Sequence, residues 1–270
     1  PQEITELMQI IRGLAAEGKS ILFISHKLNE IMSVADRCTV LRKGKYITTI
    51  PTGDATESSL TEMMVGRKVT LNIGRSEPEN TVKRLSVEHL SVMGTDGRLV
   101  LEDINFDAYG GEILGVAGIS GNGQKELLEA LAGLQMVQEG TRMTYFEGEH
   151  GEKAYDLINM TPKKIRDIGI HLAFVPEDRL GMGLVSSMGM TGNMLLKTYS
   201  RGHVGFTDLK GPRKMAEDVR RELEVATPSL STPVSRLSGG NVQKVLVGRE
   251  IAQAPTVLLT AYAVRGLDIH

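Results

Sequence analysis

The sequence lacks several features that would assign it to a particular class of protein. Its one cysteine, Cys38, leaves no partner for an internal disulfide, which fits a reducing compartment. No apolar run approaches the roughly 20 residues of a membrane-spanning helix; the longest, residues 257–264, is interrupted by Thr260 and Tyr262. The 31 Lys and Arg residues face 33 Asp and Glu residues, and this lack of a basic surplus argues against nucleic-acid binding. The chain begins at Pro1 without Met or a signal sequence, so we expect part of a longer, cytosolic protein.

The chain nevertheless has enough residues for a substantial core. With 270 residues and 41% hydrophobic content, it can form one large domain or one and a half ordinary ones. Its 30 glycines predict many turns and loops.

The first 65 residues predict a small set of elements. Apolar residues at a spacing of three and four predict a helix over residues 4–14 that ends by Gly18. Residues 20–24 form an apolar run that is typical of a buried strand, and a short helix is predicted for 28–34. Residues 39–41 and 46–49 predict a hairpin. Residues 58–65 predict a helix capped by Ser58 or Ser59.

A second block follows a linker predicted for residues 67–83. Alternating apolar residues predict antiparallel strands at 85–90 and 101–106. Buried or final strands are predicted at 113–117, 172–175 and 256–259, helices at 126–131 and 215–224, and a Gly/Met-rich loop at 181–193. Because strands alternate with helices, the fold class is α/β.

The turn between the strand at 113–117 and the following helix has the glycines of a phosphate-binding loop. Backbone N–H groups at a helix N-terminus favour an anion. The loop pattern then requires Lys and Ser or Thr, but the chain has Gln124 and Lys125 there. A glycine-rich turn without a ligand is the alternative from these residues alone. The candidate nucleotide-binding residues are Gly118, Ser120, Gly121, Asn122, Gly123, Gln124, Lys125, Glu126 and, further along the chain, Glu177.

A second motif lies about 120 residues after this loop and opens a helix. Ser238 is a suitable cap, and the two glycines that follow permit close backbone approach. The motif resembles the signature of ATP-binding-cassette (ABC) ATPases, and residues 249–252 continue that family's pattern. A Ser-Gly-Gly turn that only caps a helix is the alternative. The signature residues are Leu237, Ser238, Gly239, Gly240, Asn241 and Gln243.

The resemblance identifies three further motifs, one of which departs strongly from the family. Glu177 stands where the family has the glutamine of its Q-loop. Ala261 and Tyr262 occupy the places of an Asp that holds Mg²⁺ and a Glu that activates water, and neither side chain can do this work. With Gln124 and Lys125 this makes four altered positions, and we expect this site not to hydrolyse ATP. The D-loop is assigned to Arg265, Gly266, Leu267 and Asp268.

His26 follows the apolar run 20–24 and precedes a helix, which resembles the switch histidine of ABC ATPases. The resemblance implies a catalytic contact with the γ-phosphate of ATP. A histidine after a strand is otherwise usually structural.

The order of these motifs is unusual, because the switch histidine comes first instead of last. Two fused cassettes explain this order. Residues 1–66 would be the C-terminal part of a first cassette, and residues 84–270 would be a second cassette as far as its D-loop. The resemblance implies a P-loop NTPase fold with a mostly parallel core sheet, an antiparallel β subdomain and a helical subdomain. The alternative is that residues 1–66 dock on residues 84–270, either within one chain as a circularly permuted cassette or between two chains as a domain swap.

The chain resembles the fused two-cassette ATPases of bacterial monosaccharide and nucleoside importers. The resemblance implies ATP as the ligand, with Mg²⁺ at the intact partner site and no metal held by this chain. The implied partners are integral-membrane permease subunits and a second cassette in head-to-tail pairing, with no nucleic acid. It also implies a peripheral location on the cytoplasmic face of the bacterial inner membrane.

The sequence leaves two alternative functions open, and two local features also need an interpretation. The chain is alternatively a non-catalytic nucleotide-binding cassette, or a soluble tandem ATPase of the translation-factor type, although its linker is short and nearly neutral. The loop 180–194 is either an adaptable permease contact or a mobile loop with buried methionines. Lys163, Lys164 and Arg166 are interpreted as a solvated helix face.

Overall fold

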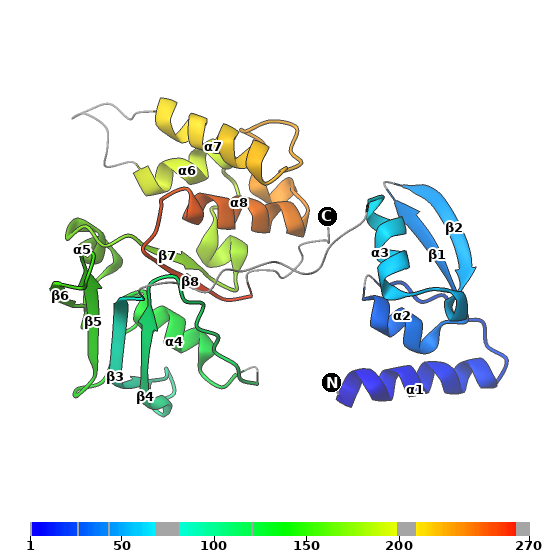
Figure 1. The fold of residues 1–270 in the computed structure, drawn as a ribbon, viewed down its shortest axis with the longest axis horizontal. Coiled ribbons are helices and arrows are strands. Elements are labelled where there is room, and N and C mark those ends of the chain that lie inside the picture. Colours follow the sequence, from blue (N-terminus) through cyan, green and yellow to red (C-terminus); the bar gives the residue numbers. More distant parts are fainter. Residues whose placement is uncertain are drawn as a thin grey trace. The chain divides into compact units, whose positions relative to one another are not determined.

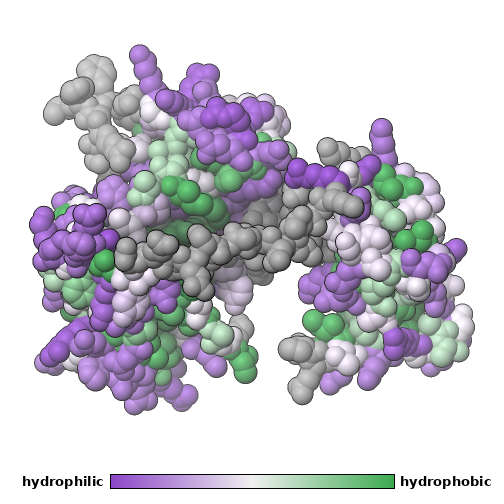
Figure 2. All heavy atoms as spheres, viewed as in Figure 1, coloured by the Kyte–Doolittle hydropathy of each residue, from purple (hydrophilic) through white to green (hydrophobic). Residues whose placement is uncertain are grey.

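The computed structural model describes residues 2–25, 27–42, 44–67, 81–119, 121–198 and 209–262. The chain divides into two compact units, whose described parts are residues 2–67 and 81–262. Each unit is described by itself below, with the elements labelled in Figure 1. Hydrophobic side chains are interspersed with hydrophilic ones on the surface of both units (Figure 2). Among the described helices, none is long and apolar enough to cross a membrane.

The first unit contains the predicted helices and hairpin. It consists of α1 (Gln2–Ala16), α2 (Leu28–Val34), the antiparallel pair β1 (Arg37–Arg42) and β2 (Lys45–Pro51), a 3-10 turn at Thr52–Asp54, and α3 (Glu57–Val65). The predicted cap of α3 is wrong by two residues. Thr56 is the cap: its hydroxyl accepts from Ser59 N (3.1 Å), and Ser59 Oγ accepts from Thr56 N (2.9 Å). Both residues satisfy backbone N–H groups that the helix leaves unpaired.

A small core holds this unit together, around Leu28, Val40 and Leu60. Cys38 lies in the same core, and burial raises the pKa of its thiol. Helix α1 contributes less, because Leu7 and Ile10 on its surface are exposed. The unit therefore presents apolar surface that its own residues do not cover.

Two predicted strands are absent from the described structure. Residues 19–25 and 112–119 have no regular secondary structure. Their apolar side chains are exposed, with Leu22 at 90%, Ile24 at 88% and Val116 at 58%. An apolar run becomes a buried strand only where neighbouring strands satisfy its backbone groups, and here neither run is paired. The prediction of strands at these places is wrong for this structure.

The second unit contains two separate sheets. Strands β3 (Lys83–Met93), β4 (Leu99–Tyr109), β5 (Arg142–Glu147) and β6 (Lys153–Asp156) form an antiparallel sheet in the order β4-β3-β5-β6. Strands β7 (Leu172–Val175) and β8 (Val257–Thr260) form a parallel pair, with Val175 opposite Thr260. The parallel sheet thus has two strands among the described residues.

The helices of this unit follow or surround these sheets. They are α4 (Gln124–Leu131), α5 (Pro162–Asp167), α6 (Met190–Thr198), α7 (Lys210–Glu222) and α8 (Gly239–Ile251), with a π-turn at Arg179–Gly183 and a 3-10 turn at Val234–Arg236. One core joins the antiparallel sheet to α4, α5 and β8, and another joins α6, α7 and α8. Strands β7 and β8 lie between them (Figure 1), because Leu259 belongs to the first core and Val175 to the second.

The Gly/Met-rich segment is more ordered than the sequence predicts. It contains the π-turn and the first residues of α6. Asn193 is fully buried and holds the chain before it, since its side chain accepts from Val185 N (2.8 Å) and donates to Met188 O (3.2 Å). Met190 and Met194 are buried in the helical core, whereas Met182 and Met188 are exposed. Two of the methionines are therefore buried, as one interpretation expects, and the permease contact stays a prediction for Met182 and Met188.

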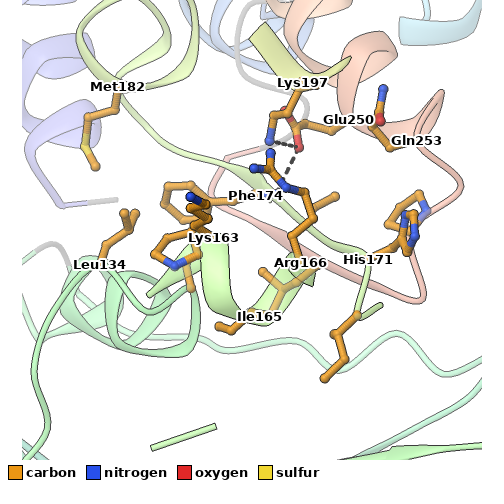
Figure 3. Close-up of a pocket in the computed structure, with 16 residues that line it drawn as sticks. Leu134, Lys163, Ile165, Arg166, His171, Phe174, Met182, Lys197, Glu250 and Gln253 are labelled. Carbon is orange, nitrogen blue, oxygen red and sulfur yellow. Dashed lines mark hydrogen bonds and ion pairs between the residues drawn. The ribbon is translucent and has the colours of Figure 1, made fainter. Parts of the chain in front are cut away.

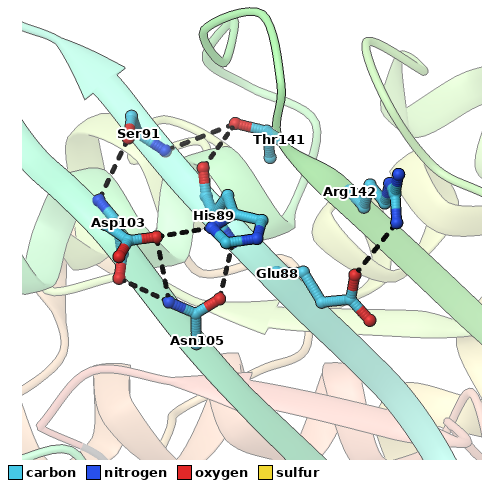
Figure 4. A network of polar contacts seen from close by, with 7 residues as sticks. All are labelled: Glu88, His89, Ser91, Asp103, Asn105, Thr141 and Arg142. Atoms are coloured by element: carbon cyan, nitrogen blue, oxygen red, sulfur yellow. Dashed lines mark hydrogen bonds and ion pairs between the residues drawn. The ribbon is translucent and has the colours of Figure 1, made fainter.

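A polar network joins β3, β4 and the start of β5 where their pairing is irregular (Figure 4). His89 and Asp103 both have left-handed backbones, with φ of 53° and 52°. Their side chains meet at 2.7 Å. Hydrogen bonds from Asn105 and then from His89 lower the pKa of Asp103. The network stabilises a bulge in the sheet.

Candidate functional site

Two glycines of the loop before α4 have left-handed backbones. Gly121 and Gly123 both have φ of 90°, which residues with a side chain rarely adopt. Gly123 also packs closely on β4. A Cβ added there would lie 2.9 Å from Val100 O and 2.5 Å from Leu101 Cδ2. A side chain at position 123 would therefore push the loop away from the sheet.

Gln124 turns its side chain back into this loop. Its Nε2 donates to Ile119 O (3.1 Å), which also accepts from Asn122 N (3.1 Å). A Cβ added at Gly118 would overlap the Gln124 carboxamide. The amide therefore lies inside the turn, at the place where the phosphate-loop pattern has a lysine.

Lys125 does not supply the missing cation to the loop. Its ammonium is exposed and lies 3.8 Å from the carboxylate of Glu129, one helical turn further along α4. Lys125 also cannot offer the hydroxyl that the pattern uses for Mg²⁺. Glu126, the remaining candidate of this helix turn, is half-buried.

The carboxyl ends of β7 and β8 bring two further motifs together. Ala261 N donates to Val175 O (2.9 Å), so the segment with Glu177 and the segment with Tyr262 leave the same edge of the parallel pair. Hard cations such as Mg²⁺ take oxygen ligands, mostly carboxylates. Ala261 has no such ligand, and Tyr262 carries only a phenol; in the described ranges no three His, Cys, Asp or Glu side chains form a metal-binding group. These residues do not fit a Mg²⁺ site.

The signature segment forms a capped and accessible helix start. The Ser238 hydroxyl accepts from Asn241 N (3.4 Å) and from Asn241 Nδ2 (2.8 Å), so the predicted cap is confirmed. Asn241 in turn accepts from Ala226 N (2.8 Å) through its side-chain oxygen. Ser238 and Gly239 are exposed, whereas Gln243, one turn further, is buried. The helix N-terminus therefore offers N–H groups and a hydroxyl to an anion from outside this unit.

Some predicted site residues lie outside the described residues. These are His26, Ser120 and the D-loop residues Arg265, Gly266, Leu267 and Asp268. Their placement stays a prediction.

A pocket that no sequence pattern indicated lies beside β7 (Figure 3). It has a volume of about 390 Å³. Its apolar lining includes Leu134, Phe174 and Met182. Its polar lining is mostly cationic or titratable and comprises Lys163, Arg166, His171, Lys197, Glu250 and Gln253. The interpretation of the lysine-rich helix face as only solvated is therefore incomplete.

A buried ion cluster forms one wall of this pocket. The Glu250 carboxylate is paired with Arg249 (2.8 Å) and with Lys197 (3.0 Å), and it accepts from Phe174 N (3.3 Å). It thereby joins α8, α6 and β7. The adjacent Arg249 and Glu250 were visible in the sequence, but Lys197 is more than 50 residues away and no pattern indicated the contact.

Comparisons with known proteins identify the family of this chain. Residues 101–260 match the ABC transporter family, to which this chain belongs. The chain is 40% identical over its whole length to the nucleoside import ATP-binding protein NupA of Lactococcus lactis subsp. cremoris, covering 52% of that protein. It is 39% identical over its whole length to the guanosine import ATP-binding protein NupO of Bacillus subtilis, covering 51%. The chain thus spans about half the length of these relatives.

Sugar importers and a solved cassette structure also match. A putative ribose/galactose/methyl galactoside import ATP-binding protein of Burkholderia cenocepacia is 35% identical over 99% of the chain, which covers 49% of that protein. The solved structure of a dimeric ATP-binding cassette bound to ADP and phosphate is similar to this chain, with a TM-score of 0.55 and 19% identity. The match covers 68% of this chain and 76% of the cassette chain. The predicted fold class, a P-loop NTPase of the ABC type, is confirmed.

Proposed function

We propose that this chain is part of the ATP-binding, energy-coupling component of a bacterial importer for a simple sugar or nucleoside. The observation that carries the proposal is the exposed signature start of α8, capped by Ser238, in a chain similar to nucleoside and sugar import proteins.

Within this function the two units belong to different cassettes. Residues 1–66 are the C-terminal part of a first cassette, residues 67–83 are the linker, and residues 84–270 are a second cassette as far as its D-loop. The support is the uncovered apolar surface of the first unit, at Leu7, Ile10, Leu22 and Ile24. The rest of a first cassette would cover these side chains. Adding the rest of the first cassette as a separate chain distinguishes this assignment from the permuted or swapped arrangement. Binding of that chain supports the assignment of residues 1–66 to a first cassette, and no binding contradicts it.

The two ATP sites of such a protein have different roles. Gln124 fills the glycine loop of this chain, and Ala261 and Tyr262 cannot hold Mg²⁺ or activate water. This site is therefore silent. Ser238, Gly239 and Gly240 instead contact the γ-phosphate of ATP held by the first cassette, where His26 acts. Mg²⁺ binds at that partner site, and the two cassettes pair head to tail.

The pocket beside β7 is the place where a permease subunit docks at the cytoplasmic face of the membrane. Its apolar lining suits one face of a helix, and Met182 at its edge adapts to different partners. Lys163, which is exposed, favours an acidic residue on that helix. The carboxylate of Glu250 is already neutralised by its own two cations and does not cancel this preference.

ATP hydrolysis by the proposed two-cassette protein tests the role of the signature. We expect Ser238→Ala to lower kcat at least about tenfold, because it removes a contact to the phosphate at the active site. Ser235→Ala is a matched control, since Ser235 is exposed three residues before Ser238. We expect it to leave turnover unchanged. Equal rates for both variants and the wild type would contradict the proposed function.

A further inference from the structure

Arg179 connects the segment after β7 directly to the signature helix. Its Nη1 donates to Gly239 O, the first carbonyl of α8, at 2.9 Å. Arg179 is half-buried as a residue, and its hydrogen bond to Gly239 lies at the surface. The two residues are 60 positions apart in the chain, which makes this a tertiary contact.

The turn that carries Arg179 is closed by several hydrogen bonds. The Asp178 carboxylate caps it by accepting from Leu180 N (3.2 Å) and Gly181 N (2.8 Å). Inside the turn, Leu184 N donates to Arg179 O (2.7 Å). The backbone of Arg179 is therefore fixed on both sides, and its side chain leaves the turn from a defined position.

The turn contacts α8 at a second place two helical turns further along. A Cβ added at Gly183 would lie 2.8 Å from Leu246 Cδ2, so the backbone there packs directly on the helix. Leu246 is fully buried. Because seven residues are close to two turns, Gly239 and Leu246 lie on the same face of α8. The turn thus holds this face at both positions.

The two contacts differ in what they do for the signature. The Leu246 contact stabilises the middle of α8 and belongs to the hydrophobic core. The Arg179 contact acts on the first turn, which has few intrahelical hydrogen bonds and frays most easily. Without it, the Ser238 cap and the hydrogen bond from Ala226 N to Asn241 Oδ1 would be the remaining described restraints on that turn.

We propose that Arg179 is a positioning residue for the signature motif. It holds the first turn of α8, so that Ser238 and Gly239 keep the orientation in which they contact the phosphate of the partner site. The role of this contact in hydrolysis rests on the proposed function of the signature. The structural part, in which Arg179 restrains the first turn, stands on the geometry alone.

Three variants separate positioning from general stability. Arg179→Met keeps the length of the side chain but removes every donor, and Arg179→Lys keeps one donor that can reach Gly239 O. Arg213→Met is the control, because Arg213 is exposed and pairs with Glu217 on the same helix. Hydrogen exchange of a peptide covering residues 237–246 is measured in each. We expect exchange about fivefold faster in Arg179→Met, since one hydrogen bond of ordinary strength is lost. We expect it to be restored in Arg179→Lys and unchanged in Arg213→Met.

The same variants in the proposed two-cassette protein give the functional result. We expect Arg179→Met to lower kcat about fivefold, with KM for ATP changed less than about twofold and Tm lowered by only about 2–4 °C, because the contact acts during turnover and not in ATP capture. Arg179→Lys should recover most of kcat. Unchanged exchange, faster exchange with unchanged kcat, or equal losses in Met and Lys with a larger fall in Tm would each overturn the proposal.

Failure of the proposed function would give a different set of results. If the wild-type protein does not hydrolyse ATP, or if Ser238→Ala is without effect, the proposed function fails. The exchange experiment then still decides whether Arg179 holds the first turn of α8.

Discussion

Removal of the Glu250 carboxylate should destabilise the second unit strongly. Its side chain is 1% exposed, and that of its partner Arg249 is 6% exposed. Glu250→Ala leaves the Arg249 guanidinium buried without an anion and removes the acceptor of Phe174 N. Lys197 is 32% exposed and can turn toward water, so breaking its pair with Glu250 costs little stability. Breaking a buried ion pair from one side costs about 3–5 kcal/mol, a large part of the roughly 5–15 kcal/mol of a typical domain.

Urea unfolding followed by circular dichroism measures this loss. The chain has two compact units, so an unfolding transition must be assigned to one of them. Hydrogen exchange of peptides from β7 and α8 makes this assignment, because both elements belong to the second unit. Glu217→Ala on α7 is the matched control: its pair with Arg213 is exposed and is worth about 0.3–0.5 kcal/mol. The double variant Arg249→Met/Glu250→Leu should recover much of the stability, since no unpaired charge stays buried. A loss of less than about 1 kcal/mol for Glu250→Ala would refute the reasoning.

Three further predictions follow from single residues. Gly123→Ala should lower Tm by several degrees, because its Cβ would collide with Leu101, and an unchanged Tm would contradict the close packing. The Lys83 ammonium, followed by the Ser86 hydroxyl, lowers the pKa of Asp107. This carboxylate therefore stabilises the fold above the ordinary pKa of Asp and loses its effect as the pH falls through the lowered pKa. The difference in urea midpoint between wild type and Asp107→Asn should be clear at pH 7 and shrink below about pH 4; a constant difference would contradict this. Burial raises the pKa of Cys38, so its alkylation at pH 7.5 should be slow until the protein unfolds, and rapid labelling of the folded chain would contradict its burial.

Elements with local determinants were predictable from the sequence. Strand β7 has the predicted bounds, and the helix at Leu28–Val34 and the hairpin β1–β2 were found from periodicity and turn residues. The cap of α8 was also visible, because Ser before two glycines is a local signal.

Features that depend on distant residues were not predictable in the same way. The runs at 20–24 and 113–117 have the composition of buried strands, but pairing decides whether a strand forms, and neither run is paired. In the candidate site, the glycine loop was recognised, but the return of the Gln124 side chain into it requires coordinates. The contacts of Arg179 with Gly239 and of Lys197 with Glu250 join positions more than 50 residues apart, and one sequence contains no signal for them.

The number of nucleotides trapped during turnover tests the central claim most directly. Vanadate stops an ATP-hydrolysing site after cleavage with ADP bound, so trapped ADP counts the sites that hydrolyse. With Gln124 in the glycine loop and Ala261 and Tyr262 at the end of β8, the proposed two-cassette protein has one working site. We predict one trapped ADP per protein molecule, and trapping at least about tenfold slower in Ser238→Ala. Two trapped ADP per molecule would contradict the account.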